Sequence, residues 1–111
     1  MRISVSCVIN DAADAQHANQ ACAELMTLLS ASYPDHRFTN APSNDIPALA
    51  IFVQNANEST LGVHIEWTTL TGQKITGHPM SVVTMDTKLN PSRRQSLYRR
   101  LLAETPMPKS D

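Results

Sequence analysis

The 111-residue sequence predicts an α+β fold, a two-layer sandwich in which two helices cover one face of a mostly antiparallel sheet of four or five strands. Two observations favour this class. Two segments repeat apolar residues at helical spacing, and several shorter segments alternate apolar and polar residues as half-buried strands do. The predicted order is strand, helix, a short strand, three strands and a helix. Because each helix has one apolar stripe, both helices fit on the same face of the sheet.

The first strand and the longer helix lie in the N-terminal third of the chain. Residues 2–10 alternate and predict a half-buried strand. Its inward side chains are Ile3, Val5, Cys7 and Ile9. Residues 12–32 predict an amphipathic helix that Pro34 ends, with Asn10 or Asp11 as the N-cap and Asp14 in the first turn.

The middle of the chain predicts the remaining strands. Residues 37–39 indicate a short edge strand, residues 40–45 are rich in turn formers, and the apolar run at 48–53 indicates a central strand covered on both faces. Residues 61–69 alternate, which turns Trp67 inward. A hairpin loop at 70–72 leads into a strand over 74–86 that is interrupted at 77–79, where Pro79 indicates an edge or a bulge.

The last helix begins at Pro91, with Asn90 as its N-cap, and Pro106 ends it. Its apolar face is formed by Leu97, Tyr98, Leu101 and Leu102. We expect a single α+β domain over residues 1–105 and a C-terminal tail over 106–111.

Charge and composition argue against several functional classes. The formal net charge is −1, with two basic and seven acidic residues in 1–66 and seven basic and three acidic residues in 67–111. The last helix is therefore basic. For its surface of Lys88, Arg93, Arg99 and Arg100 we expect solvent or an acidic protein surface rather than nucleic acid. The chain carries no glycine-rich phosphate loop, which excludes nucleotide binding of that kind.

The apolar runs and the two cysteines indicate a location. The longest apolar run has six residues, whereas a membrane span needs about 20. The alternating N-terminus does not resemble a signal peptide, and Cys7 and Cys22 match neither a metal motif nor a disulfide framework. We expect a cytoplasmic protein in which both cysteines are neighbouring, buried and reduced.

The first candidate site lies on the outer face of the second hairpin. A loop at 70–72 pairs Trp67 with Ile75, both inward, and brings His64 opposite His78, with Glu66 beside them. Two imidazoles and a carboxylate about 5–7 Å apart can bind a metal or a ligand, or transfer protons. The alternative is an ordinary solvated face, and a one-residue change of register removes the pairing. No metal-binding motif is present, and we expect neither a metal nor a cofactor.

Arg94 is the second candidate. It lies on the apolar stripe of the last helix, one turn before Leu97, and its charge opposes the helix dipole. We expect Arg94 to contact Asp86 or to bind an anionic ligand. The alternative is that it follows the rim of the core and extends its charged head into water.

These patterns do not identify an activity. We expect a non-enzymatic cytoplasmic domain that acts by association, as a homodimer or with a protein partner, through the open sheet face or an edge strand. The alternative is a small enzyme or ligand-binding protein that uses His64, Glu66 and His78, or an anion pocket at Arg94. A cleft of a few hundred cubic ångströms beside any of these residues would distinguish the two.

Overall fold

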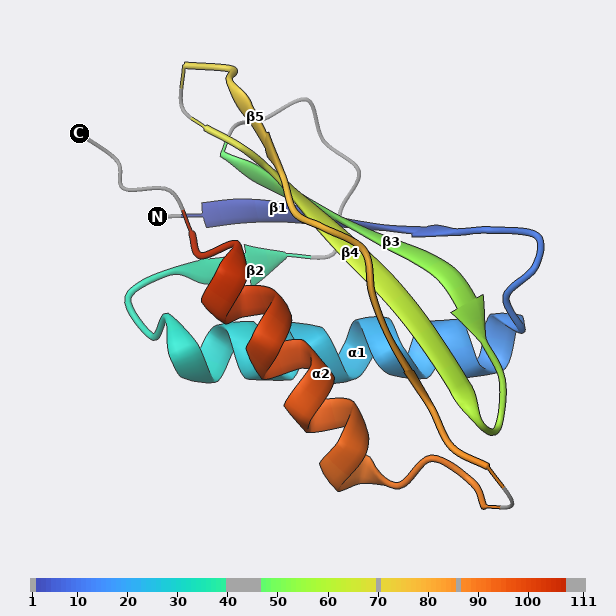
Figure 1. Ribbon diagram of the computed structural model, residues 1–111. Coiled ribbons are helices and arrows are strands. Elements are labelled where there is room, and N and C mark those ends of the chain that lie inside the picture. Colours follow the sequence, from blue (N-terminus) through green and yellow to red (C-terminus); the bar gives the residue numbers. More distant parts are fainter. Residues whose placement is uncertain (1, 40–46, 70, 86, 108–111) are drawn as a thin grey trace.

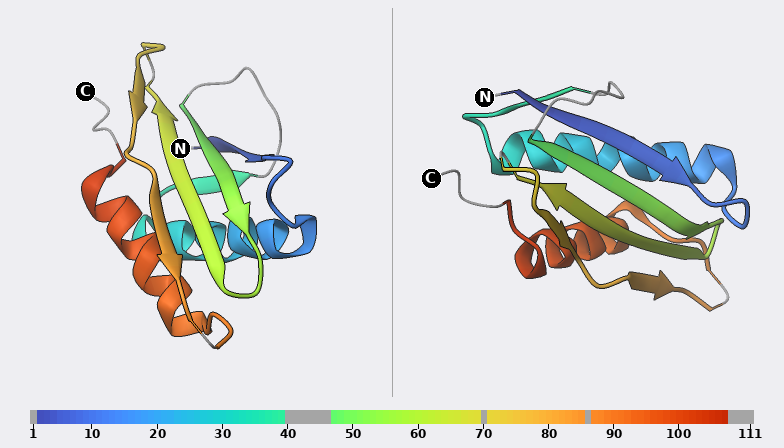
Figure 2. Two further views of the ribbon diagram at one scale, coloured as in Figure 1. Left: turned by 45° about the vertical axis from the view of Figure 1, so that its right-hand side comes forward. Right: turned by 90° about the horizontal axis from the view of Figure 1, so that it is seen from above.

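Two helices pack on one face of a six-stranded sheet (Figure 1). The computed structural model describes residues 2–39, 47–69, 71–85 and 87–107. Within these residues, no helix lies on the other face of the sheet, as the two further views also show (Figure 2). The predicted α+β class and its two layers are confirmed.

The sheet is mixed and mostly antiparallel. Its strands are β1 (Arg2–Ile9), β2 (Arg37–Thr39), β3 (Ala48–Ala56), β4 (Thr60–Thr68), β5 (Lys74–Thr76) and β6 (Met80–Val83). The order is β2-β1-β3-β4-β5, and β6 also pairs with β4. β1 runs parallel to β2 and β3, whereas β4 is antiparallel to each of its three partners. The predicted short edge strand at 37–39 is confirmed.

Both helices begin at a side-chain cap. Helix α1 (Ala15–Ser32) is capped by Asp14, which accepts a hydrogen bond from the His17 N–H at 3.1 Å. The predicted caps were wrong by about one turn, because Asn10 instead accepts from the Ala12 N–H in the connecting turn. Helix α2 (Pro91–Glu104) begins as predicted, with Asn90 accepting from the Arg93 N–H at 2.9 Å.

The core lies between the helices and the inward face of β1, β3 and β4. Along β3 buried residues alternate with half-buried ones. The strand is central as predicted, but the expectation that both its faces are covered was wrong. Trp67 is buried as predicted, and its Nε1 donates to the Thr105 carbonyl oxygen at 2.8 Å, at the end of α2.

The predicted strand over 74–86 is divided by a bulge. Thr76 pairs with Glu66, but Met80 pairs with Val63, so residues 77–79 face only two residues of β4. Trp67 pairs with Ile75 as predicted, yet Ile75 is 37% exposed and does not enter the core. Gly72 adopts the left-handed φ of +87° expected for the hairpin loop. Leu70 of that loop and the turn-rich stretch at 40–45 lie outside the described residues.

Cys7 and Cys22 form a disulfide that joins β1 to α1. Their Cα atoms are 6.3 Å apart, within the usual range for this bond. The expectation that the two residues are neighbours was right, and the expectation of reduced thiols was wrong. The bond depends on where α1 crosses β1, which the spacing of the two cysteines does not reveal.

The C-terminal end of the described chain contacts the core. Of the predicted tail, Met107 packs on the core, and its N–H donates to the Tyr33 hydroxyl at 3.2 Å.

Neither helix in the described part of the chain combines the length and the apolar composition needed to cross a bilayer.

We expect removal of the disulfide to lower stability without changing the fold. A crosslink over a separation of 15 residues restricts the unfolded chain by about 3 kcal/mol. Equilibrium unfolding in urea should show that loss for the double variant Cys7→Ala/Cys22→Ala. The unaltered protein in excess dithiothreitol is the matched control and should show a similar loss. Equal stabilities with and without reductant would contradict the prediction.

The space around Gly77, in the bulge, and Gly62, in β4, predicts different effects of alanine substitution on stability. A Cβ on Gly77 would collide with the Thr105 Oγ1 and lie 3.2 Å from the Thr105 Cβ, so Gly77→Ala should cost about 1–3 kcal/mol. Gly62→Ala on β4 is the control. Its nearest contact would be 3.6 Å, and stability should change by less than about 1 kcal/mol. Thermal unfolding of both variants measures the difference.

Candidate functional site

The Arg94 guanidinium lies between the two helices and binds Glu24 of α1. Its Nε donates to Oε1 at 2.8 Å and its Nη2 donates to Oε2 at 3.0 Å, while Nη1 donates to the Leu89 carbonyl oxygen at 3.1 Å. The side chains of Arg94 and Glu24 are only 14% and 22% exposed. Arg94 therefore does not extend its head into water. Asp86, the partner expected from the sequence, lies outside the described residues.

Tyr98 completes this polar contact between the helices. Its hydroxyl donates to the Glu24 Oε1 at 2.8 Å. Burial, together with the hydrogen bond to Glu24, raises the pKa of Tyr98 well above its ordinary value. The hydrogen bonds that Arg94 donates to Glu24 likewise raise the pKa of Arg94. The phenol thus stays a proton donor and the guanidinium stays charged, so three hydrogen bonds from α2 hold one carboxylate of α1.

A pocket of about 140 Å³ lies beside this contact, where the N-terminal ends of the helices approach the β3–β4 turn. It is lined by His17, Gln20, Ala56, Asn57, Glu58, Leu61, Lys88, Leu89 and Arg94. Since one water occupies roughly 30 Å³ of liquid, the pocket has room for a small ligand, and drug-sized ligands need about 300 Å³ or more. The pocket lies beside Arg94, but it is smaller than the cleft of a few hundred cubic ångströms that would favour the ligand-binding alternative.

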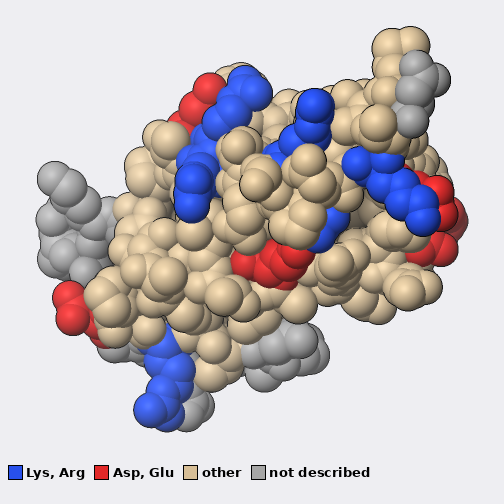
Figure 3. Space-filling view, turned by 90° about the horizontal axis from the view of Figure 1, so that it is seen from below, with Lys and Arg blue, Asp and Glu red and all other residues tan. Residues whose placement is uncertain are grey.

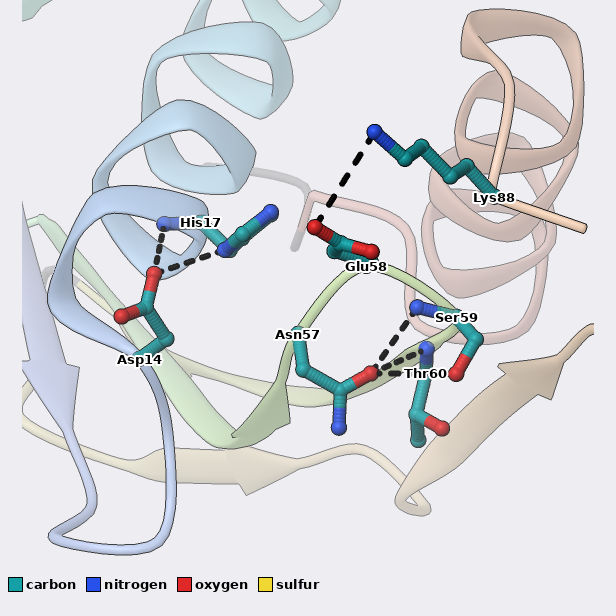
Figure 4. A network of polar contacts seen from close by, with 7 residues as sticks. All are labelled: Asp14, His17, Asn57, Glu58, Ser59, Thr60 and Lys88. Carbon is teal, nitrogen blue, oxygen red and sulfur yellow. Dashed lines mark hydrogen bonds and ion pairs between the residues drawn. The ribbon is translucent and has the colours of Figure 1, made fainter.

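Two polar pairs stand on opposite sides of this pocket (Figure 4). On α1, the His17 Nδ1 lies 2.6 Å from the Asp14 Oδ2. Across from it, the Lys88 Nζ lies 4.0 Å from the Glu58 Oε1. Hydrogen bonds from His17 lower the pKa of Asp14, so the helix cap should persist to lower pH than the pKa of an ordinary aspartate would allow. It is lost only as the pH falls through that lowered pKa.

Hydrogen bonds from backbone N–H groups stabilise the β3–β4 turn, which lines one side of the pocket. The Asn57 Oδ1 accepts from the N–H groups of Ser59 and Thr60, both at 2.9 Å, which shapes the turn (Figure 4). The Leu89 N–H donates to the Glu58 carbonyl oxygen at 2.7 Å. The segment before α2 is thereby tied to the turn between β3 and β4, and Lys88 is placed beside Glu58.

The structure changes the strand pairing on which the first candidate site was based. His64 and Glu66 lie on the open face of β4, but the bulge interrupts the ladder where His78 was expected opposite His64. His64 instead stacks on Phe52, with ring centroids 4.5 Å apart. Glu66 accepts from the Thr76 hydroxyl at 3.0 Å. Within the described ranges, no three side chains of the metal-binding types form a group that could hold an ion.

Basic side chains are dispersed over the helix side of the molecule. On the helix side of the molecule, lysine and arginine side chains lie in separate groups with other residues and some acidic ones between them (Figure 3).

Sequence reasoning missed the residues that the structure adds around Arg94. Glu24, His17 and Glu58 were not among the candidate site residues predicted from the sequence. The one available signal was Arg94 itself, because a charge on an apolar stripe needs a partner. Which carboxylate serves depends on how the helices cross.

Comparisons with known proteins relate the chain to others by fold alone. No protein-family model matches it, and no curated protein matches its sequence. Two solved structures of PelC dodecamers from Paraburkholderia phytofirmans, in different crystal forms, are similar in structure. The first has a TM-score of 0.72 and 16% identity, and covers 96% of this chain and 88% of its own. The second has a TM-score of 0.66 and 16% identity, and covers 97% and 89%.

The Arg94–Glu24 pair predicts a stability difference between neighbouring arginines. Arg94→Met keeps the apolar stem but leaves Glu24 with Tyr98 as its remaining described donor, so the free energy of unfolding should fall by about 2 kcal/mol. Arg93→Met on the exposed side of α2 is the matched control and should change stability by less than about 0.5 kcal/mol. Urea unfolding measures both. Equal, small effects would show that the pair contributes nothing.

Proposed function

We propose that the chain acts by association with copies of itself and has a non-enzymatic role. The observation that carries this proposal is the sheet face without a helix. A cross-strand row of Val8, Phe52 and His64 runs over its centre, and Val83 lies on the same face. Val8 is 47% exposed and Val83 is 59% exposed. Uncovered apolar and aromatic side chains on a sheet face are typical of surfaces that another protein covers.

The rest of this open face allows close approach. Around the central row lie small residues, namely Ser6, Ala50, Gly62 and Ser81. Small side chains let a second surface reach the backbone of the sheet, so an aromatic pair can serve as the anchor of an interface. Beside this face, Met85 follows the edge strand β6 and is 85% exposed. An exposed edge with apolar side chains favours pairing with another chain.

The structural neighbours support association of like subunits. Both are dodecamers, and each aligns with this chain over nearly all of its length. A homodimer through the open face is the smallest assembly that fits the proposal, and the neighbours favour a larger one.

Association predicts that charge on the open face separates the subunits. Light scattering after size exclusion should give the unaltered protein a mass that is a multiple of 12.2 kDa. Val8→Lys/Val83→Lys should reduce that mass toward a single chain with an unchanged circular dichroism spectrum. Ser30→Lys, on the exposed side of α1, is the control and should not. A single-chain mass for the unaltered protein at every concentration would refute the proposal.

A second candidate function is binding of a small anion in the pocket at Arg94. A guanidinium has five N–H donors, and the described contacts use three of them. One donor each on Nη1 and Nη2 has no acceptor among the described residues. The neighbouring Glu58 carboxylate disfavours a dianion, so a monoanionic carboxylate suits the pocket best.

Acetate is a suitable probe of this pocket. If it binds, the melting temperature should rise with acetate beyond the effect of equimolar chloride. Lys88→Gln should weaken that rise, whereas Lys74→Gln, on distant β5, should not. Equal effects of acetate and chloride on the unaltered protein would exclude the site.

A further inference from the structure

We infer that the Cys7–Cys22 disulfide is a permanent structural bond and that the chain therefore folds and works in an oxidising compartment. The chain has two cysteines, and the bond uses both. Full pairing of an even number of cysteines is typical of proteins in oxidising compartments, whereas cytosolic thiols are kept reduced. This replaces the cytoplasmic location expected from the sequence.

The surroundings of the bond fit a structural role. Cys22 is buried among the core residues of α1, and Cys7 is half-buried and packs against the same core. A reducing thiolate has little access to a sulfur in that position, and access limits thiol–disulfide exchange. Catalytic and redox-sensing cysteines instead lie in exposed, electropositive settings.

The disulfide lies close to the residue that links the two helices. Cys22 ties α1 to the sheet through β1, and Glu24, two residues further on, ties α1 to α2 through Arg94 and Tyr98. The closed loop also contains Asp14 and His17, which stand beside the Arg94 pocket. One turn of α1 thus holds the covalent link to one layer and the polar link to the other helix.

Formation of the bond needs an oxidant. The two thiols lose two protons and two electrons as the S–S bond forms, and the disulfide of a thiol–disulfide oxidoreductase takes them up and becomes a dithiol. The exchange passes through a mixed disulfide between the two proteins.

Thiol trapping in the cells that naturally produce the protein tests the inference. Acid-quenched cells are denatured and treated with a bulky maleimide, which adds to free thiols and retards the chain on a gel. We expect no retardation unless a reductant is added first, and then a shift by two additions. The single variants Cys7→Ser and Cys22→Ser are controls that must show the maleimide adduct. Two additions on the unaltered chain without reduction would overturn the inference.

A second measurement separates a structural bond from a reversible switch. The purified oxidised protein is incubated with a glutathione buffer of cytosolic composition. We expect the bond to persist in the folded protein, with a melting temperature above that of the dithiothreitol-reduced protein. Ready reduction by glutathione, or equal melting temperatures, would overturn the structural role. Neither readout depends on oligomer mass, so failure here is distinct from failure of the proposed association.

Discussion

The apolar inner face of β1, β3 and β4 must be shielded from water, and the rest of the structure depends on how the two helices cover it. Its large members include Ile3, Leu49, Ile51, Ile65 and Trp67, and all of these are buried. Each contributes about 1.5–3 kcal/mol if it is fully removed from water. Two helices of 18 and 14 residues cover this face. In the described part of the chain no further helix is available for the other face, which is why half-buried and exposed apolar residues meet there.

The two helices that cover the sheet must also be aligned with each other. Apolar contacts alone allow many crossing positions, because cores tolerate different packings of similar volume. The Glu24 carboxylate restricts the crossing positions of the helices, because it must accept its hydrogen bonds from Arg94 and Tyr98 at suitable angles. A half-buried charge is costly without its partners, and that cost disfavours any other alignment of the helices.

The elements of the fold were predictable, and their contacts at long range were not. Periodicity located both helices and the strands, and Asn90–Pro91 marked the start of α2. Pro79 indicated the interruption of the fifth predicted strand, although not the one-residue change in register that moves His78 relative to His64. Arg94 was recognised as anomalous, but its partner is 70 residues away. The disulfide was missed for the same physical reason, since two inward faces meet at a point that only the packing defines.

The Glu24 contact also has a consequence for how this sequence can change in evolution. One carboxylate accepts hydrogen bonds from two residues of a different helix, so a substitution at position 24 removes the acceptor of both residues at once. Among homologous chains, positions 24, 94 and 98 should therefore vary together as a set, as residues in spatial contact do. A chain that carries an apolar residue at 24 should carry apolar residues at the other two positions as well. Such a set would mark the same crossing of the helices in sequences too divergent to align by identity.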